Sequence, residues 1–223
     1  MEVAFRLALP HGHCVGVSIP EAMPAAALAA LRPEERARAE ALALPRRLTW
    51  VAGRLALREA LEEMGMEVGP VLSDDRGAPD LPGEVRGSIS HKRTLAVALV
   101  APPGGGRVGV DLEEVAPLRV DISPRVLTAG ERQALPGASA GGARDRAVLL
   151  RLCAKEAIYK ALDPFVRRYV SFQEVTVHPR DDGGAEVELA LAGQEGPFAV
   201  EVRWRELEAG RPFLLTTANV QAR

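Results

Sequence analysis

The chain has 223 residues, of which 47% are hydrophobic and 26% are charged, and its formal net charge is −2. This composition predicts a globular fold and excludes a disordered chain, and the near-neutral charge gives no reason to expect a nucleic-acid partner. No apolar run is long enough to cross a bilayer, and the first residues do not resemble a signal peptide. We therefore expect a cytoplasmic protein that does not bind membranes. The distant cysteines, Cys14 and Cys153, predict neither a disulfide framework nor a metal site.

The first half of the chain predicts a mixture of helices and strands from its apolar spacing and its Gly and Pro breaks. The expected elements are, in chain order, a strand at 14–19, one or two helices at 21–44, a stronger helix at 46–64, a strand at 68–72, a loop at 73–87, a strand end at 88–91 and a strand at 94–100.

The Gly/Pro-rich stretch 101–106 separates this half from a second set of similar elements. Those elements are expected as a strand at 107–112, a helix within 122–135, a long helix at 144–162 and strands at 170–177, 185–191, 198–204 and 213–220. The fold class is therefore predicted as α+β, with two lobes of similar size at 1–103 and 107–223.

Two carboxylates stand close together at the end of the strand Val108-Gly109-Val110-Asp111-Leu112-Glu113. Residues i and i+2 of a strand face the same side, so Asp111 and Glu113 lie side by side. Two adjacent carboxylates repel, and a cation between them relieves this cost. Oxygen ligands of this kind suit Mg²⁺. The segment alone fits equally well a solvated acidic strand end.

The helix predicted at 144–162 carries Lys155-Glu156 and, one turn later, Lys160. An exposed Glu–Lys pair at i, i+4 is common on any helix and explains Glu156 and Lys160 taken alone. However, Leu149 and Leu152 share the Glu156 side, so this carboxylate is expected to be partly buried, in a cleft or an interface.

The strand end Ser88-Ile89-Ser90-His91 is followed directly by Lys92 and Arg93. Hydroxyl, imidazole and cationic donors gathered in this way could hold a phosphate, although a lone histidine is more often structural. The only lysines of the chain are Lys92, Lys155 and Lys160, so lysine is confined to this cluster and to the long helix.

Taken together, these segments resemble the 4'-phosphopantetheinyl transferase superfamily, and within it the larger, pseudo-dimeric class that activates surfactin synthetase. The family motif (V/I)G(V/I)D(I/L)E is matched by VGVDLE at 108–113, and WxxKEAxxK by LCAKEAIYK at 152–160. An upstream Ser-His pair is matched by Ser90-His91. The resemblance implies two similar α/β lobes related by pseudo-twofold symmetry, an active site in the cleft between them, and a monomer.

The resemblance also implies a reaction and its residues. Coenzyme A would donate its 4'-phosphopantetheine to a serine of an apo acyl or peptidyl carrier protein, and adenosine 3',5'-bisphosphate would leave. Mg²⁺ would be held by Asp111, Glu113 and Glu156. Lys155 and Lys160 would add positive charge at the phosphates or hold Glu156, which could accept the serine proton.

The resemblance places Ser90 and His91 at the 3'-phosphate of the nucleotide, and Arg47 and Arg54 near it. Many relatives have Gly-Lys-Pro before the Ser-His motif, and here Ala78 stands in place of that lysine, so Arg76 is the candidate substitute. The family tryptophan is replaced by Leu152. Arginines near the long helix are candidates for docking an acidic carrier protein: Arg125, Arg132, Arg144 and Arg146.

Two other functions fit the same residues. Another Mg²⁺-dependent enzyme that cleaves the pyrophosphate of a small nucleotide would use the same carboxylates. A non-catalytic scaffold would need none of them. The run Gly104 to Gly106 is not a phosphate loop, because no Gly-Lys-Ser/Thr follows it.

Overall fold

A computed structural model describes residues 1–137 and 141–223 of the chain. It is a mixed α/β protein with two sheets, which confirms the predicted α+β class. The chain divides into two compact units, Met1–Val110 and Asp111–Arg223. The boundary falls within strand β5 (Arg107–Glu114). Among the described residues, no helix combines the length and the apolar character that crossing a membrane requires.

The first unit is built on a four-stranded antiparallel sheet in the order β1-β2-β4-β3. Its strands are β1 (Val3–Leu9), β2 (Gly12–Ser18), β3 (Gly87–His91) and β4 (Leu95–Val100). Strands were predicted near the last three positions, and the structure confirms them. β1 was not predicted, although its exposure alternates residue by residue as expected for a strand with one buried face.

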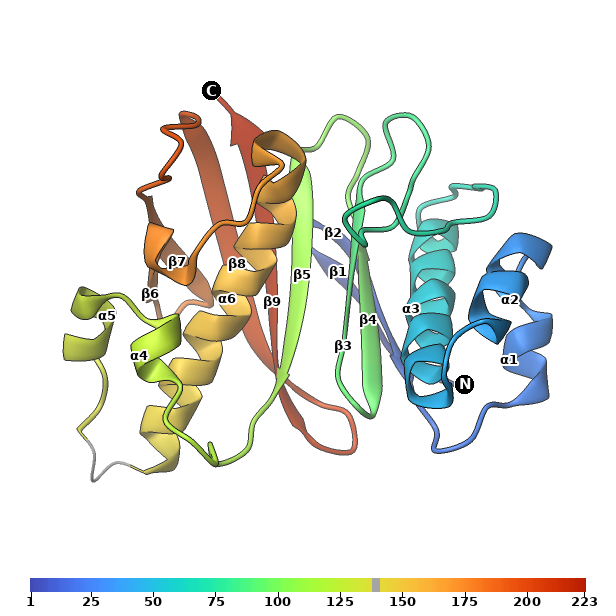
Figure 1. The fold of residues 1–223 in the computed structure, drawn as a ribbon, viewed down its shortest axis with the longest axis horizontal. Helices are drawn as coiled ribbons and strands as arrows, with labels where there is room; N and C mark the ends of the chain where they lie inside the picture. The colour runs from blue at the N-terminus through green and yellow to red at the C-terminus, as the bar shows by residue number, and fades with distance from the viewer. Residues whose placement is uncertain (138–140) are drawn as a thin grey trace. The chain divides into compact units, whose positions relative to one another are not determined.

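Helix α3 (Leu44–Glu63) packs against this sheet, as Figure 1 shows. Its small residues Ala52, Ala56 and Ala60 join β2 and β4 in one buried core. Gly53 allows β3 to come close to the helix, because a Cβ at this position would lie 2.8 Å from a methyl carbon of Ile89. This close approach matters for the site, since Ile89 directly precedes Ser90 and His91.

Two short helices, α1 (Ala25–Ala29) and α2 (Pro33–Glu40), pack beside α3 and confirm the one or two helices predicted at 21–44. The strand predicted at 68–72 is wrong, because this segment forms no ladder. Side chains satisfy its backbone instead. Glu35 accepts from the Val71 N–H at 2.9 Å, and Arg54 donates to the carbonyls of Val71 and Leu72, both at 2.7 Å.

The second unit contains a five-stranded sheet in the order β5-β9-β8-β7-β6. The strands that follow β5 are β6 (Val175–Pro179), β7 (Gly184–Leu189), β8 (Phe198–Glu208) and β9 (Pro212–Ala222). The last three fall where β-type segments were predicted, whereas β6 begins five residues later than the strand predicted at 170–177, because residues 172–174 form a 3₁₀ turn. Helix α6 (Gly142–Val166) lies across this sheet in Figure 1, and its stripe of Ala154, Ala157, Ile158, Ala161 and Leu162 packs into the buried core of the unit.

Short helices connect β5 to α6 and α6 to β6. One helix was predicted within 122–135, but the structure has two, α4 (Ser123–Val126) and α5 (Ala129–Gln133). Thr128 divides them because its hydroxyl accepts from the Glu131 N–H and caps α5. A 3₁₀ turn, η2 (Phe172–Glu174), leads into β6. Helix α6 is longer than the predicted range 144–162 and includes Pro164, and its C-cap residue Arg167 adopts the left-handed conformation.

Candidate functional site

Strand β5 carries the two carboxylates that the sequence singles out. Val110 and Leu112 are completely buried and anchor the strand in the core, while Asp111 is only 5% exposed and Glu113 is half-buried. Strand alternation places Asp111 and Glu113 on the same side of β5. A buried carboxylate such as Asp111 needs a compensating charge, because burial disfavours its ionised form.

Lys160 of α6 supplies that charge. Its Nζ donates to Asp111 Oδ1 at 2.8 Å, and the Asp111 side chain is only 7% exposed. The structure thus brings together two residues 49 positions apart, one from each of the two main sequence motifs. Glu156 lies one turn before Lys160 on the same helix, so α6 presents both side chains on neighbouring parts of its surface.

The buried thiol of Cys153 reports the electrostatics of this region. Burial raises the pKa of Cys153 well above its usual value, and the negative charges of Asp111 and Glu113 raise it further, while Lys160 opposes them. The Asp111, Glu113 and Lys160 charges are therefore all within electrostatic reach of one point in α6. Cys153 itself is a free, buried cysteine and not a reactive thiolate.

Glu156 faces a small pocket of about 60 Å³ in the second unit. The pocket is also lined by Tyr159 and Tyr169, whose rings are 6.3 Å apart, and by residues of the segment 170–175. The partial burial predicted for Glu156 is confirmed. In the described part of the chain, no three His, Cys, Asp or Glu side chains lie close enough together to hold a metal ion.

Lys155 lies in the interior of the second unit, an environment that its sequence motif does not indicate. It is 1% exposed, and its Nζ donates to Glu131 Oε2 at 2.6 Å and to the carbonyls of Val126 and Phe172 at 2.9 and 2.8 Å. Burial lowers the pKa of Lys155, and the hydrogen bond and charge of Glu131 oppose this. The Lys155 side chain therefore points into the interior of the second unit rather than toward Glu156.

The Ser90-His91 pair lies at the end of β3 in the first unit. Ser90 is buried, and His91 Nε2 is 2.8 Å from Nη1 of Arg46, in the first turn of α3. A guanidinium can only donate, so Nε2 accepts and the neutral imidazole carries its proton on Nδ1. Arg46 was not predicted. Its position beside His91 depends on how α3 packs on β3, which neither segment reveals alone.

The two arginines predicted near the nucleotide have partners within the first unit. Arg47 donates to the carbonyls of Glu40 and Leu42 and so closes the end of α2. Arg54 is 6% exposed, lies 4.6 Å over the Trp50 ring and also donates to Ser73 Oγ. Burial is the main cause that lowers the pKa of Arg54 to about 10.

Arg76 lies on the exposed loop predicted at 73–87. The Asp74 carboxylate accepts from the backbone N–H groups of Arg76 and Ala78, both at 2.9 Å, and so shapes the turn. Arg76 is exposed. Its place on the loop is compatible with the substitute role that the sequence suggests.

Comparison with known proteins identifies the family. Residues 34–101 match the model of the 4'-phosphopantetheinyl transferase N-terminal domain, and residues 107–217 match the model of the 4'-phosphopantetheinyl transferase superfamily. The chain is 32% identical over 201 residues to the 4'-phosphopantetheinyl transferase Svp of Streptomyces mobaraensis, covering 86% of this chain and 79% of that protein. The chain belongs to the 4'-phosphopantetheinyl transferase superfamily. Both of its halves match, as expected for the larger type.

Other relatives of the transferase match over shorter regions. This chain is 34% identical over 143 residues to the 4'-phosphopantetheinyl transferase Npt of Nocardia iowensis, with 63% of each chain covered. It is 35% identical over 118 residues to enterobactin synthase component D of Escherichia coli K12, covering 52% of this chain and 54% of that one. A holo-(acyl-carrier-protein) synthase of Bacillus anthracis, solved in complex with coenzyme A (3',5'-ADP), is 22% identical. It covers 53% of this chain and 96% of its own, with a TM-score of 0.39.

Proposed function

We propose that this transferase moves the 4'-phosphopantetheine of coenzyme A onto a serine of an apo acyl or peptidyl carrier protein in a Mg²⁺-dependent reaction. The observation that supports it most directly is the 2.8 Å contact between Lys160 Nζ and Asp111 Oδ1. This contact holds the helix motif against the strand motif, so the acidic and basic groups that handle a diphosphate are gathered in one unit.

The carboxylates fit the proposed metal by their chemistry. Mg²⁺ prefers oxygen ligands, and Asp111, Glu113 and Glu156 are the proposed protein ligands. Mg²⁺ commonly takes only one or two protein carboxylates and completes its shell with water and substrate phosphates. Among the described residues no three such side chains lie close enough together to hold an ion, so only one or two of these carboxylates would contact Mg²⁺ directly and water and substrate phosphates would complete its shell. When bound, Mg²⁺ neutralises charge on the diphosphate.

The side chains then have separate tasks in the transfer. The serine Oγ forms a bond to the phosphorus nearest pantetheine, the bond from that phosphorus to the adenosine-bearing phosphate breaks, and adenosine 3',5'-bisphosphate leaves. Glu156 accepts the serine proton, directly or through water. Lys160 holds Asp111 and adds positive charge where the leaving phosphate gains negative charge.

The nucleotide end of coenzyme A is proposed to bind Ser90 and His91, together with Arg46. The Arg46 guanidinium and the His91 ring, 2.8 Å apart, form a pair of donors that suits a phosphate once the ring is protonated or turned. Arg47, Arg54 and Arg76 stay proposed contributors to this end, with Arg76 the most exposed of the three.

The carrier protein is proposed to dock on arginines near the start of α6. Arg125 is exposed, whereas Arg144 donates to the Pro136 carbonyl and Arg146 pairs with Glu206 and lies over the Trp204 ring. Arg132 donates to the Leu127 carbonyl. We also propose that the transferase acts as a monomer in the cytoplasm. Both of its cysteines are buried and neither is in a disulfide, which agrees with a reducing compartment.

Intact-mass measurement of an apo carrier protein tests this function. Incubation with coenzyme A, Mg²⁺ and the transferase should increase the carrier mass by one phosphopantetheine arm, and Glu156→Ala should abolish the increase. Breakdown of coenzyme A with no change in carrier mass would instead identify a hydrolase. No reaction with either substrate, together with coenzyme A binding that does not respond to Mg²⁺, would identify a non-catalytic scaffold.

A further inference from the structure

A buried ion pair in the second unit has no part in the reaction described above. Lys155 Nζ has three hydrogens and three acceptors: Glu131 Oε2, the Val126 carbonyl and the Phe172 carbonyl, all within 2.9 Å. Every donor of Lys155 is therefore used inside the protein, and none is available for a phosphate.

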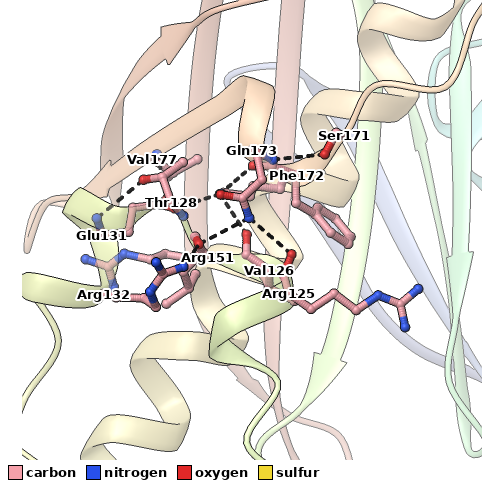
Figure 2. A network of polar contacts seen from close by, with 12 residues as sticks. Arg125, Val126, Thr128, Glu131, Arg132, Arg151, Ser171, Phe172, Gln173 and Val177 are labelled. Atoms are coloured by element: carbon pink, nitrogen blue, oxygen red, sulfur yellow. Dashed lines mark hydrogen bonds and ion pairs between the residues drawn. The ribbon is translucent and has the colours of Figure 1, made fainter.

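Glu131 is held just as completely. It is 0% exposed, its Oε1 accepts from the Val177 N–H at 2.8 Å, and its Oε2 accepts from the Thr128 N–H at 2.7 Å as well as from Lys155. Figure 2 shows Glu131 close to Val177 and Thr128 in this network. Moving Lys155 away would leave a buried carboxylate without its cation, which is strongly unfavourable.

The network ends at the pocket that Glu156 faces. Lys155 and Glu156 are consecutive in α6, and the pocket is lined by Ser171, Phe172 and Val175 beside them. The Phe172 carbonyl is one of the Lys155 acceptors. The same 3₁₀ turn is fixed from its other side by Gln173, whose Nε2 donates to the carbonyls of Arg125 and Leu127, both at 3.2 Å. One connected set of hydrogen bonds thus fixes both the helix turn that carries Glu156 and the opposite wall of its pocket.

We propose that Lys155 and Glu131 are positioning residues that set the location of Glu156 for transfer, and that Lys155 does not contact coenzyme A. This inference rests on the proposed function, since Glu156 is the group whose position it explains. Of the two roles that the family resemblance implies for Lys155, it selects the holding of Glu156 over the phosphate contact, and it adds Glu131 as the buried partner of Lys155.

Steady-state kinetics and coenzyme A binding, measured by calorimetry on the full chain with Mg²⁺, test the proposal. The variants are Lys155→Met, which keeps an unbranched side chain of similar length, Glu131→Gln, and the double variant. We expect each single variant to lower kcat about tenfold or more, with the Kd for coenzyme A within about twofold of the unmodified protein. The double variant should be no slower than the slower single one, because both substitutions break the same pair.

The split between kcat and coenzyme A binding separates positioning from a purely stabilising role. Both single variants are measured where circular dichroism shows them folded, so a lower kcat with unchanged coenzyme A binding reports a displaced Glu156 rather than unfolded protein. An unchanged kcat in the folded variants would overturn the proposal. A tenfold weaker coenzyme A binding in Lys155→Met, with Glu131→Gln fully active, would also overturn it and restore the direct contact.

Gln173→Ala provides a test if the buried variants do not fold, because Gln173 is exposed and its loss removes only two bonds. A kcat lowered about two- to fivefold with unchanged coenzyme A binding is expected, and an unchanged kcat would contradict the proposal. The unmodified protein serves as the reference in every series. If it does not load the carrier protein, the proposed function fails, whereas losses confined to the variants address positioning.

Discussion

At the scale of single residues, Asp111 and Lys160 determine the charge at the proposed metal site. Asp111 is almost fully buried and has Lys160 at 2.8 Å, so a divalent cation would share this carboxylate with an ammonium group. The charge of Lys160 opposes a second cation nearby, while the neighbouring carboxylate of Glu113 favours it. The metal affinity of the site should therefore respond in opposite directions to the loss of the acid and the loss of the base.

The acidic side of this balance predicts the effect of neutral variants. Asp111→Asn and Glu113→Gln should raise the Mg²⁺ concentration for half-maximal transfer about tenfold or more, because each removes a charged oxygen ligand. Glu114→Gln is the matched control, since Glu114 points to the other side of β5 and pairs with Arg211 at 2.7 Å. Magnesium titrations of all three would contradict the assignment if Glu114→Gln were affected as strongly as the other two.

The loss of Lys160 is predicted to change kcat and the Mg²⁺ requirement in different ways. Lys160→Met should lower kcat about tenfold, yet lower the Mg²⁺ concentration required, because the competing cation at Asp111 is gone. The same titration measures both quantities. An increased Mg²⁺ requirement in Lys160→Met would show instead that Lys160 organises the carboxylates for the metal.

His91 and Arg46 predict how the enzyme recognises the nucleotide. Arg46→Ala and His91→Ala should each weaken binding of coenzyme A about tenfold or more, the typical loss for a charge-assisted hydrogen bond. Neither substitution should weaken the binding of 3'-dephospho-coenzyme A, because this ligand lacks the 3'-phosphate. Binding measured by calorimetry for both ligands tests this, and equal losses for the two would place the pair elsewhere on the ligand.

At the scale of whole elements, the 3₁₀ turn beside the Glu156 pocket is stabilised by an ionic cluster. Arg168 donates to both oxygens of Glu174 at 2.8 and 3.2 Å and also pairs with Glu195. Glu174 further accepts from the Ser171 and Ala192 N–H groups at 2.8 and 2.7 Å. These bonds lower the pKa of Glu174 to about 2, and the hydrogen bond from Arg168 is the largest cause.

This lowered pKa predicts a pH-dependent stability. The folded-state pKa of Glu174 lies below its unfolded value of about 4.5, so its contribution is complete above about pH 5 and is lost as the pH falls toward about 2. Glu174→Gln should therefore lower the melting temperature at neutral pH and have a smaller effect near pH 3. Thermal melts at both values measure this. Glu188→Gln is the control, because the Glu188 side chain is 77% exposed, and it should change the melting temperature little at either pH.

The elements also show where sequence patterns were informative and where they were not. The long helix and the strand before it were predicted because their apolar spacing is strong, and the Asp111–Lys160 contact follows from packing those two elements together. The strand expected at 68–72 is apolar enough, but Glu35 and Arg54 bind its backbone from helices far away in sequence. The buried environment of Lys155 could not be predicted for the same reason, since its partner Glu131 is 24 residues away and not marked by any motif.

At the scale of the whole molecule, net charge gives no overall attraction for the acidic carrier protein proposed as substrate. The net charge is −2, so attraction must come from a local patch such as the exposed Arg125 near α6. Arg125→Ala should raise the KM for the carrier protein several-fold at low salt, with the difference shrinking as salt screens the charge. Arg38→Ala, at an exposed arginine of α2 in the first unit, is the control. A salt-independent effect would indicate packing rather than electrostatic attraction.

Three nearby side chains of helix α6 point to different surroundings. Lys155 points into the interior of the second unit, Glu156 lines the pocket, and Lys160 contacts Asp111 of strand β5. Each residue added to an α-helix turns everything beyond it by about 100°. A single alanine inserted between Glu156 and Lys160 would remove no functional group, but it would turn Lys160 away from Asp111 and break their contact. The length of that one helical turn therefore matters to the site as much as the identity of the side chains on it.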